Sequence, residues 1–227
     1  MFRAVARHHL TTCVDWNEAM RILSAVILVM ALEAGTISAS AQNAASGIAE
    51  RSAGEERAIN LCSTCHGPRG ISTSPEFPIL AAQRPAYIVA QLENFQHKTR
   101  EEKAAHDFMY GIAGNLDART IESIAAYYSS QPAAPGRPGD PAQVAIGKKL
   151  FETGVLDRGV PPCVSCHGAR AEGVADFPRL AGQHAKYVMR QIEYIQGLVR
   201  KAPVMHGIVK DLTPAEIGAV AAYVQSL

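Results

Sequence analysis

The sequence has no apolar run long enough to span a bilayer, no marked excess of charge and a single tryptophan, Trp16. Its apolar run from Ile22 to Leu32 covers about 11 residues, whereas a transmembrane helix needs about 20. Lysine and arginine together number 22 and aspartate and glutamate 21, so the formal net charge is +1 and no nucleic-acid partner is indicated. These absences favour a charge-balanced soluble protein.

Cysteine is also scarce, and Cys13 stands apart from the other four near the amino terminus. From Met20 the chain reads MRILSAVILVMALEAGTISASAQ, with one basic residue, a short apolar run and an A-x-A site that ends at Ala41. This is the layout of a secretory signal peptide. We therefore predict that residues 1–41 are a signal peptide region, that translation starts at Met20, and that the mature protein is exported to the periplasm without Cys13. The alternative is an uncleaved N-terminal anchor.

The other four cysteines lie in two copies of one phrase, LCSTCHGPRG and PCVSCHGARA. Further residues recur about 100 positions apart between the two parts of the chain, which indicates a duplicated domain. The recurring pairs include Phe77/Phe177, Pro78/Pro178, Leu80/Leu180, Gln83/Gln183, Tyr87/Tyr187, Gln91/Gln191, Glu93/Glu193, Met109/Met205, Leu116/Leu212 and Tyr127/Tyr223.

Both copies are predicted to be helical. The last segment, LTPAEIGAVAAYVQSL, offers Thr213 as N-cap and Glu216 as its capping-box partner, followed by apolar residues at helical spacing. Asp117 takes the cap position in the first copy. Middle helices are expected to begin near Pro85 and Lys186, and another helix is expected before each C-x-x-C. Because no alternating strand pattern of useful length is present, the fold class is predicted to be all-α.

The copies are separated by QPAAPGRPGDP, whose prolines and glycines disfavour regular structure and predict a semi-extended spacer. We therefore expect an N-terminal domain over residues 42–131, a proline-rich linker over 132–141 and a C-terminal domain over 142–227. The formal net charge is −2 over residues 42–131 and +2 over residues 140–227. This modest asymmetry suggests that the two ends dock different partners.

Three readings of a paired C-x-x-C compete with one another. A structural zinc site would need both pairs together, but zinc modules bring their pairs within a few tens of residues. A redox-active dithiol of the thioredoxin type expects a βαβ context, which this helical chain lacks. A disulfide in an exported protein would explain the cysteines, but not the histidine that follows directly in both copies.

The histidine indicates a fourth interpretation, because C-x-x-C-H is the attachment signature of c-type haem. Two thiols form thioethers with the porphyrin, and the adjacent imidazole binds the iron. The prediction is two covalently bound haem c groups, one held by Cys62 and Cys65 with His66, and the other by Cys163, Cys166 and His167. Each domain has only about 80 to 90 residues, so a haem would also supply much of its buried apolar surface.

The second axial ligand decides whether such an iron carries electrons or binds small molecules. Met109 in HDFMYGIAGNL and Met205 in APVMHGIVKDL share the pattern M-x-G-I, which predicts them as the axial iron ligands opposite His66 and His167. We expect both methionines in polar, glycine-containing loops before the capped final helix. A thioether ligand raises the reduction potential relative to stronger donors.

Each methionine also has a structural alternative as a gap-filler in a helical core. The rival ligands are His106 and His206, which have no counterpart in the other copy and are interpreted as surface histidines. His97 and His184 likewise lack a counterpart in the other copy.

Taken with the haem motifs, FPILAAQRPAYIVAQLENF and FPRLAGQHAKYVMRQIEYI resemble the dihaem cytochrome c4 family, in which two class I cytochrome c domains stand in tandem. The resemblance spans residues 42–227. It implies a periplasmic electron carrier whose two domains face each other, with haem propionates near their interface, and which delivers electrons to respiratory oxidases. This sequence departs from an even repeat by one extra residue after the first haem motif and four more between Tyr87 and Met109.

The leading functional prediction is therefore a non-enzymatic carrier of single electrons between respiratory donors and a terminal oxidase or another acceptor. Its expected partners are redox proteins, including membrane oxidase or reductase complexes, with peripheral membrane association. The first alternative is the dihaem subunit of a periplasmic dehydrogenase, which resembles this chain at the same motifs, as in flavocytochrome c sulfide dehydrogenase. A dihaem peroxidase is a further alternative, but it needs an iron that can open, which methionine at both sites disfavours.

Overall fold

The computed structural model describes residues 53–227, and these belong to one compact unit. The predicted signal peptide region 1–41, with its start at Met20 and with Cys13, lies outside the described residues. The described part divides into a first half, residues 53–130, and a second half, residues 141–227. No helix within residues 53–227 is both long and apolar enough to cross a membrane.

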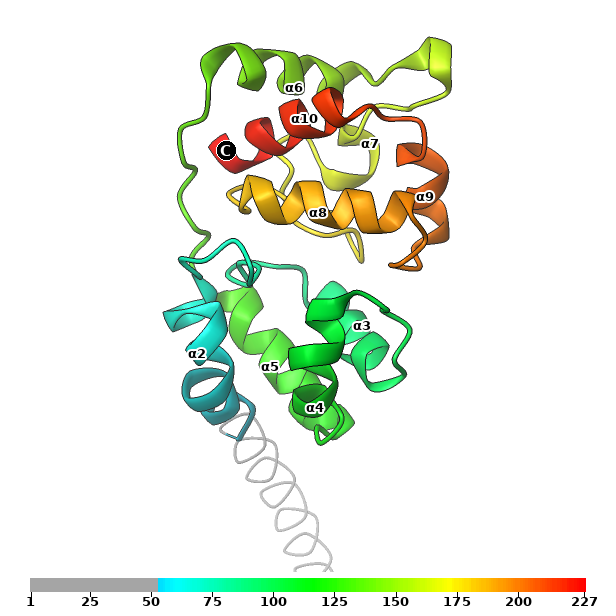
Figure 1. The fold of residues 1–227 in the computed structure, drawn as a ribbon. Coiled ribbons are helices and arrows are strands. Elements are labelled where there is room, and N and C mark those ends of the chain that lie inside the picture. Colours follow the sequence, from blue (N-terminus) through cyan, green and yellow to red (C-terminus); the bar gives the residue numbers. More distant parts are fainter. Residues whose placement is uncertain (1–52) are drawn as a thin grey trace, which may run out of the picture. The chain divides into compact units, whose positions relative to one another are not determined.

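Both halves consist of helices and loops, and no strand is present in the described residues, so the all-α prediction is confirmed (Figure 1). Residues 53–57 are helical and continue into the π-helix η1 (Ala58–Cys62). The first half then contains α2 (Ser63–His66), η2 (Pro68–Gly70), α3 (Pro85–Gln96), η3 (Ala105–Met109), α4 (Tyr110–Ala113) and α5 (Ala118–Ser130). The second contains α6 (Pro141–Thr153), η4 (Leu156–Arg158), α7 (Val164–His167), α8 (Ala185–Gln196), α9 (Pro203–Val209) and α10 (Pro214–Ser226).

The final helix of each half begins where its capping residues predict. Thr213 Oγ1 accepts a hydrogen bond from the Glu216 amide, and the Glu216 carboxylate accepts one from the Thr213 amide, so the capping box is complete. In the first half the Asp117 carboxylate accepts a hydrogen bond from the Thr120 amide at 2.8 Å. These local contacts satisfy amide groups that have no partner inside the helix.

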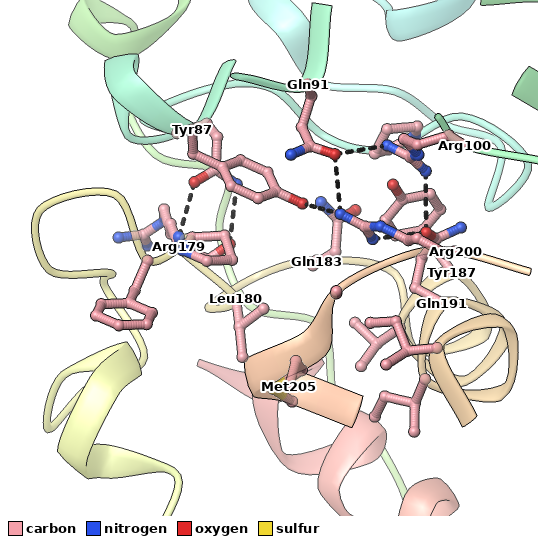
Figure 2. A pocket seen from close by; sticks show the side chains of 18 of the residues that line it. Tyr87, Gln91, Arg100, Arg179, Leu180, Gln183, Tyr187, Gln191, Arg200 and Met205 are labelled. Atoms are coloured by element: carbon pink, nitrogen blue, oxygen red, sulfur yellow. Dashed lines mark hydrogen bonds between the residues drawn. The ribbon is translucent and has the colours of Figure 1, made fainter. Parts of the chain in front are cut away.

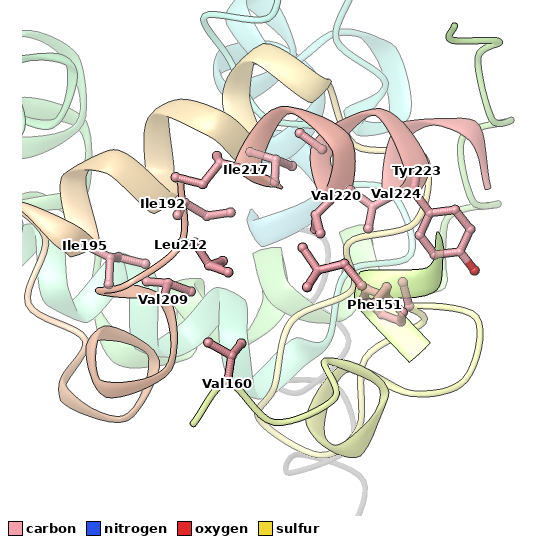
Figure 3. Close-up of a cluster of buried hydrophobic side chains, with 14 of the residues drawn as sticks. Phe151, Val160, Ile192, Ile195, Val209, Leu212, Ile217, Val220, Tyr223 and Val224 are labelled. Atoms are coloured by element: carbon pink, nitrogen blue, oxygen red, sulfur yellow. The ribbon is translucent and has the colours of Figure 1, made fainter. Parts of the chain in front are cut away.

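Each half has its own apolar core. In the second half, Phe151 of α6 is fully buried and packs at 5.4 Å between ring centroids against Tyr223 of α10. Figure 3 shows these two side chains beside aliphatic residues of α8, α9 and α10, including Ile192, Val209 and Val224. A separate cluster in the first half gathers residues from α3, α4 and α5, including the fully buried Tyr128.

The segment between the halves, predicted to be a spacer, has no regular structure but is packed. Ala134 is buried in a small apolar cluster with Ile79 and Ala81 of the first half. The amide of Arg137 donates a hydrogen bond to the carbonyl of Gln225 in α10, at 2.9 Å. The segment therefore contacts both halves. Its prolines prevent regular structure, so its other polar backbone groups form hydrogen bonds with neighbouring elements.

The expectation that both methionines lie in loops is wrong. Met109 is the last residue of the π-helix η3, and Met205 lies within the α-helix α9. Arg100 and Arg200 form an isolated antiparallel bridge, so the two repeats are aligned at that point with an offset of 100 residues. The four additional residues of the first half therefore fall between Arg100 and Met109, where residues 103–113 form a longer helical stretch than α9.

The halves fill one equivalent position in the core differently. Gly70 has φ of +78°, and a Cβ there would lie 2.7 Å from the ring of Tyr128. In the second half the corresponding residues are Ala171, at φ of +53°, and Val224. The first half thus pairs a glycine with the large ring of a tyrosine, and the second half pairs an alanine with the smaller side chain of a valine.

We predict that Gly70→Ala destabilises the first half by about 1–3 kcal/mol, because the added methyl overpacks against Tyr128. The double variant Gly70→Ala with Tyr128→Val reproduces the pair found in the second half. It should show a favourable coupling energy of at least about 0.5 kcal/mol in a double-mutant cycle of denaturant unfolding. Additive effects of the two substitutions would contradict the packing argument.

Candidate functional site

The two predicted iron-binding histidines end short helices and are buried. His66 closes α2 and is 8% exposed, and His167 closes α7 and is 6% exposed. His66 Nδ1 lies 2.9 Å from the carbonyl oxygen of Pro78, and His167 Nδ1 lies 3.0 Å from that of Pro178. Because a carbonyl only accepts, each Nδ1 carries the proton and each Nε2 keeps its lone pair for a metal.

Burial also favours the neutral form of these imidazoles. It lowers the pKa of His66 and of His167, and the hydrogen bonds to the proline carbonyls offset the shift in part. A neutral imidazole with a free Nε2 is the form that binds iron.

The four cysteines of the motifs are free thiols in this structure. Burial raises the pKa of Cys62 and raises that of Cys163 to about 11, whereas a reactive dithiol needs a lowered pKa. Within residues 53–227 no group of three or more histidine, cysteine, aspartate or glutamate side chains could hold a metal ion, which disfavours the zinc alternative.

All eight predicted site residues line a single cavity of about 530 Å³ that extends through both halves. Its walls are mostly aliphatic and aromatic, and several wall residues, such as Leu92 and Val209, also belong to the apolar cores. The predicted site residues are Cys62, Cys65, His66, Met109, Cys163, Cys166, His167 and Met205.

In each half, a glutamine that was not among the predicted site residues binds the segment that follows the methionine. Gln96 of α3 donates to the carbonyls of Ala113 and Leu116, at 3.0 and 2.7 Å. In the second half, Gln196 of α8 donates to the carbonyls of Val209 and Leu212, at 2.8 and 2.9 Å. The two glutamines are 100 residues apart, so the repeat itself carried the signal. Each anchors the segment after a methionine to the middle helix.

The other histidines are placed differently from one another. His106 is exposed, as predicted. His206 is half-buried and its Nδ1 donates to the carbonyl of Ile195 at 2.9 Å. His184 is only 4% exposed, and its Nε2 lies 2.8 Å from Ser72 Oγ of the first half. The surface interpretation is thus wrong for His206 because the imidazole is held by a backbone carbonyl, and His184 is a buried residue between the halves.

A symmetric polar cluster joins the halves beside the cavity (Figure 2). Gln91 Oε1 accepts from both Arg100 and Arg200, each at 3.0 Å, and Gln191 Oε1 accepts from the same two arginines, at 3.0 and 2.7 Å. Arg200 also donates to the Tyr87 hydroxyl at 2.6 Å. The sequence showed these tyrosines and glutamines as repeats but gave no indication that they meet.

The cluster departs from symmetry at Glu102, because the five residues after Arg200, KAPVM, contain no acidic residue. Glu102 is 2% exposed, and its Oε1 accepts from Arg100 Nε at 2.7 Å. Two buried guanidinium groups therefore face one buried carboxylate, since Arg200 makes no ion pair among the pairs found in the described residues. A buried positive charge in this position favours an anionic group in the adjoining cavity.

These residues fit one haem c group in each half. The two thiols of each motif, the lone pair of the histidine Nε2 and the methionine thioether are the donors that a covalently attached, six-coordinate haem requires. A bound haem supplies one-electron exchange between ferric and ferrous iron. The protein residues orient the imidazole through the proline carbonyls, and they exclude water with apolar walls.

Comparisons with known proteins point to one family. The cytochrome c family model matches residues 144–227. The chain is 38% identical to cytochrome c4 of Thiocapsa roseopersicina, over 82% of this chain and 97% of that protein. It is 34% identical to a thiosulfate dehydrogenase electron acceptor of Stutzerimonas stutzeri, over 75% of this chain and 80% of the relative.

Among solved structures, cytochrome c4 of Acidithiobacillus ferrooxidans matches with a TM-score of 0.70 and 35% identity. The match covers 73% of this chain and 98% of the known one.

Proposed function

Because the chain belongs to the cytochrome c4 family and is a dihaem electron-transfer cytochrome, we propose that it carries single electrons in the periplasm between a respiratory donor and a terminal oxidase or other acceptor. In this proposal Cys62, Cys65, Cys163 and Cys166 attach the two haem c groups. His66 with Met109, and His167 with Met205, are the axial iron ligands.

The observation that carries the ligand assignment is the repeated geometry of the two sites. In each half a buried histidine has its Nδ1 proton fixed on a proline carbonyl, and the paired thiols and one methionine line the same cavity. A ligand on both faces of the iron leaves no position for a substrate, which suits electron transfer. The positive charge of the Arg100 and Arg200 cluster also suits haem propionates at the junction of the halves.

The location and the domain limits belong to the same proposal. We place the signal peptide in residues 1–41 and the two haem domains over 42–131 and 142–227, with residues 132–141 between them. Covalent attachment suits an exported carrier, because thioether bonds keep the cofactor on the protein.

A dehydrogenase partner is the second candidate role. It is favoured by the match to a thiosulfate dehydrogenase electron acceptor, which covers 80% of that relative. In this role the chain accepts electrons from a periplasmic dehydrogenase as its separate partner or subunit. Co-purification with a dehydrogenase, and rapid reduction by it, would favour this role over a freely diffusing respiratory carrier.

Methionine ligation is tested with Met109→Leu and Met205→Leu, each compared with Met189→Leu as a control. Leucine keeps the side-chain volume but cannot bind iron. Met189 packs against the second core and is absent from the cavity lining. We expect each ligand variant to lose about half of the methionine-to-iron charge-transfer absorption and to bind carbon monoxide at one reduced haem of two.

The control variant should keep the full charge-transfer absorption and bind no gas. A pyridine haemochrome assay should recover two haem groups per chain in all three variants. The ligand assignment fails if Met109→Leu or Met205→Leu leaves the spectrum unchanged. The electron-carrier proposal fails if the unmodified protein binds carbon monoxide rapidly.

A further inference from the structure

Two buried glutamines reach across between the halves, and each binds the backbone of the opposite half. Gln183 Oε1 accepts from the Ile79 amide at 2.9 Å, and its Nε2 donates to the Ile79 carbonyl at 3.0 Å. Gln83 Oε1 accepts from the Arg179 amide at 2.7 Å, and its Nε2 donates to the Arg179 carbonyl at 3.0 Å. Gln83 is 6% exposed and Gln183 is 7% exposed. Figure 2 shows Gln183 and Arg179 at this junction.

The residues that they bind follow directly after the prolines that hold the histidines. The Pro78 carbonyl, which accepts from His66, and the Ile79 amide, which donates to Gln183, belong to one peptide group. The same holds for the peptide group between Pro178 and Arg179, which joins His167 to Gln83.

Two hydrogen-bond chains therefore run in opposite directions across the junction. One runs from His66 of the first half, through a single peptide group, to Gln183 of the second. The other runs from His167 of the second half, through a single peptide group, to Gln83 of the first. Each chain has two hydrogen bonds, and all four are between 2.7 and 3.0 Å.

Hydrogen bonds in such a chain strengthen one another. An amide that donates becomes more polarised, and the carbonyl of the same peptide group becomes a better acceptor, by about 10–30% per bond in condensed phases. A better acceptor at Nδ1 makes the imidazole a stronger donor to its metal. A stronger donor favours ferric iron and so lowers the reduction potential.

We propose that Gln83 and Gln183 are positioning residues that act across the junction, each setting the donor strength of the histidine in the opposite half. The inference rests on the proposed ligation of iron by His66 and His167. It follows that the reduction potential of each haem depends on a glutamine of the other half. The two centres are thus electronically linked through the protein as well as through space.

The test uses the dihaem protein with Gln83→Leu and Gln183→Leu as mirror variants. Each haem is followed separately by its nuclear magnetic resonance signals during a redox titration. We expect Gln83→Leu to raise the potential of the second haem, and Gln183→Leu that of the first. The expected change in the reduction equilibrium is about threefold to tenfold, where tenfold equals about 59 mV for one electron. In the reduced protein, the Nδ1 proton resonance of the opposite histidine should move upfield as its hydrogen bond weakens.

Glu101→Gln is the matched control, because it breaks the exposed cross-junction ion pair between Lys201 and Glu101 without touching either hydrogen-bond chain, and Glu101 is absent from the cavity lining. It should leave both potentials unchanged. A second measurement needs no variant: a scalar coupling through the hydrogen bond should connect the Ile79 amide nitrogen to the Gln183 side-chain carbonyl carbon. The absence of that coupling overturns the proposal even if the leucine variants fail to fold.

The haem at which the reduction potential changes distinguishes this inference from simpler explanations. A shift at the haem of the variant's own half, an equal shift at both haems, or no shift at either contradicts it. Failure of the proposed function gives a different result, since the unmodified protein would then lack two six-coordinate haems before any glutamine is changed.

Discussion

Replacing both Cys163 and Cys166 by alanine is expected to leave one haem per chain and to unfold the second half. The walls of the cavity include Ile192, Val209 and Leu212, which are also members of the second core. Without an attached haem these side chains would line an empty space.

The size of this effect follows from the cavity. We assign half of the 530 Å³ to each half of the chain, because the repeat provides one haem site in each, and an empty cavity costs on the order of 24 cal/mol per Å³. The penalty is therefore roughly 6 kcal/mol, which is comparable with the whole stability of a small domain. A half of fewer than 100 residues has no reserve of buried surface to offset it.

Far-ultraviolet circular dichroism and a haemochrome assay measure this outcome. The variant should lose about half of its helical signal and bind one haem, and Cys62→Ala with Cys65→Ala should do the same for the first half. A one-haem protein that keeps its full helical signal and melts cooperatively would show that the apolar core suffices without the cofactor.

Gly147→Ala is expected to destabilise the second half by about 1–3 kcal/mol or more, although alanine ordinarily stabilises a helix. Gly147 lies in α6 where this helix crosses α10, and a Cβ there would lie 1.9 Å from the carbonyl oxygen of Ala219. The obstacle is backbone, so the two helices would have to move apart.

Gly218→Ala in α10 is the control, because a Cβ at that position meets nothing within 4 Å. It should be neutral or stabilise by up to about 1 kcal/mol through helix propensity. Denaturant unfolding of the two variants measures the contrast. Equal stabilities would mean that the crossing of α6 and α10 is loose enough to accept a methyl group.

The sequence of α6 alone does not predict that Gly147 lies against α10, because within a single helix a glycine is only a weak helix former. The first half has a similar close contact, since a Cβ at Gly54 would lie 2.2 Å from the side chain of Ser123. Local propensity describes one segment at a time, whereas a crossing depends on two segments far apart in the chain. Met205 was expected in a loop but lies in α9, whose seven residues are too few to show a clear helical period.

The sequence alone determined the duplication, the helical class, the caps at Asp117 and Thr213 and the two C-x-x-C-H motifs. Each of these depends on residue types at short spacings, or on their recurrence, and such patterns are visible without a fold. Only the tertiary structure decided what lies between the halves. The bonds from Gln83 and Gln183 to the opposite backbone span about 100 residues, and no local preference encodes a contact that exists only once two folded halves meet.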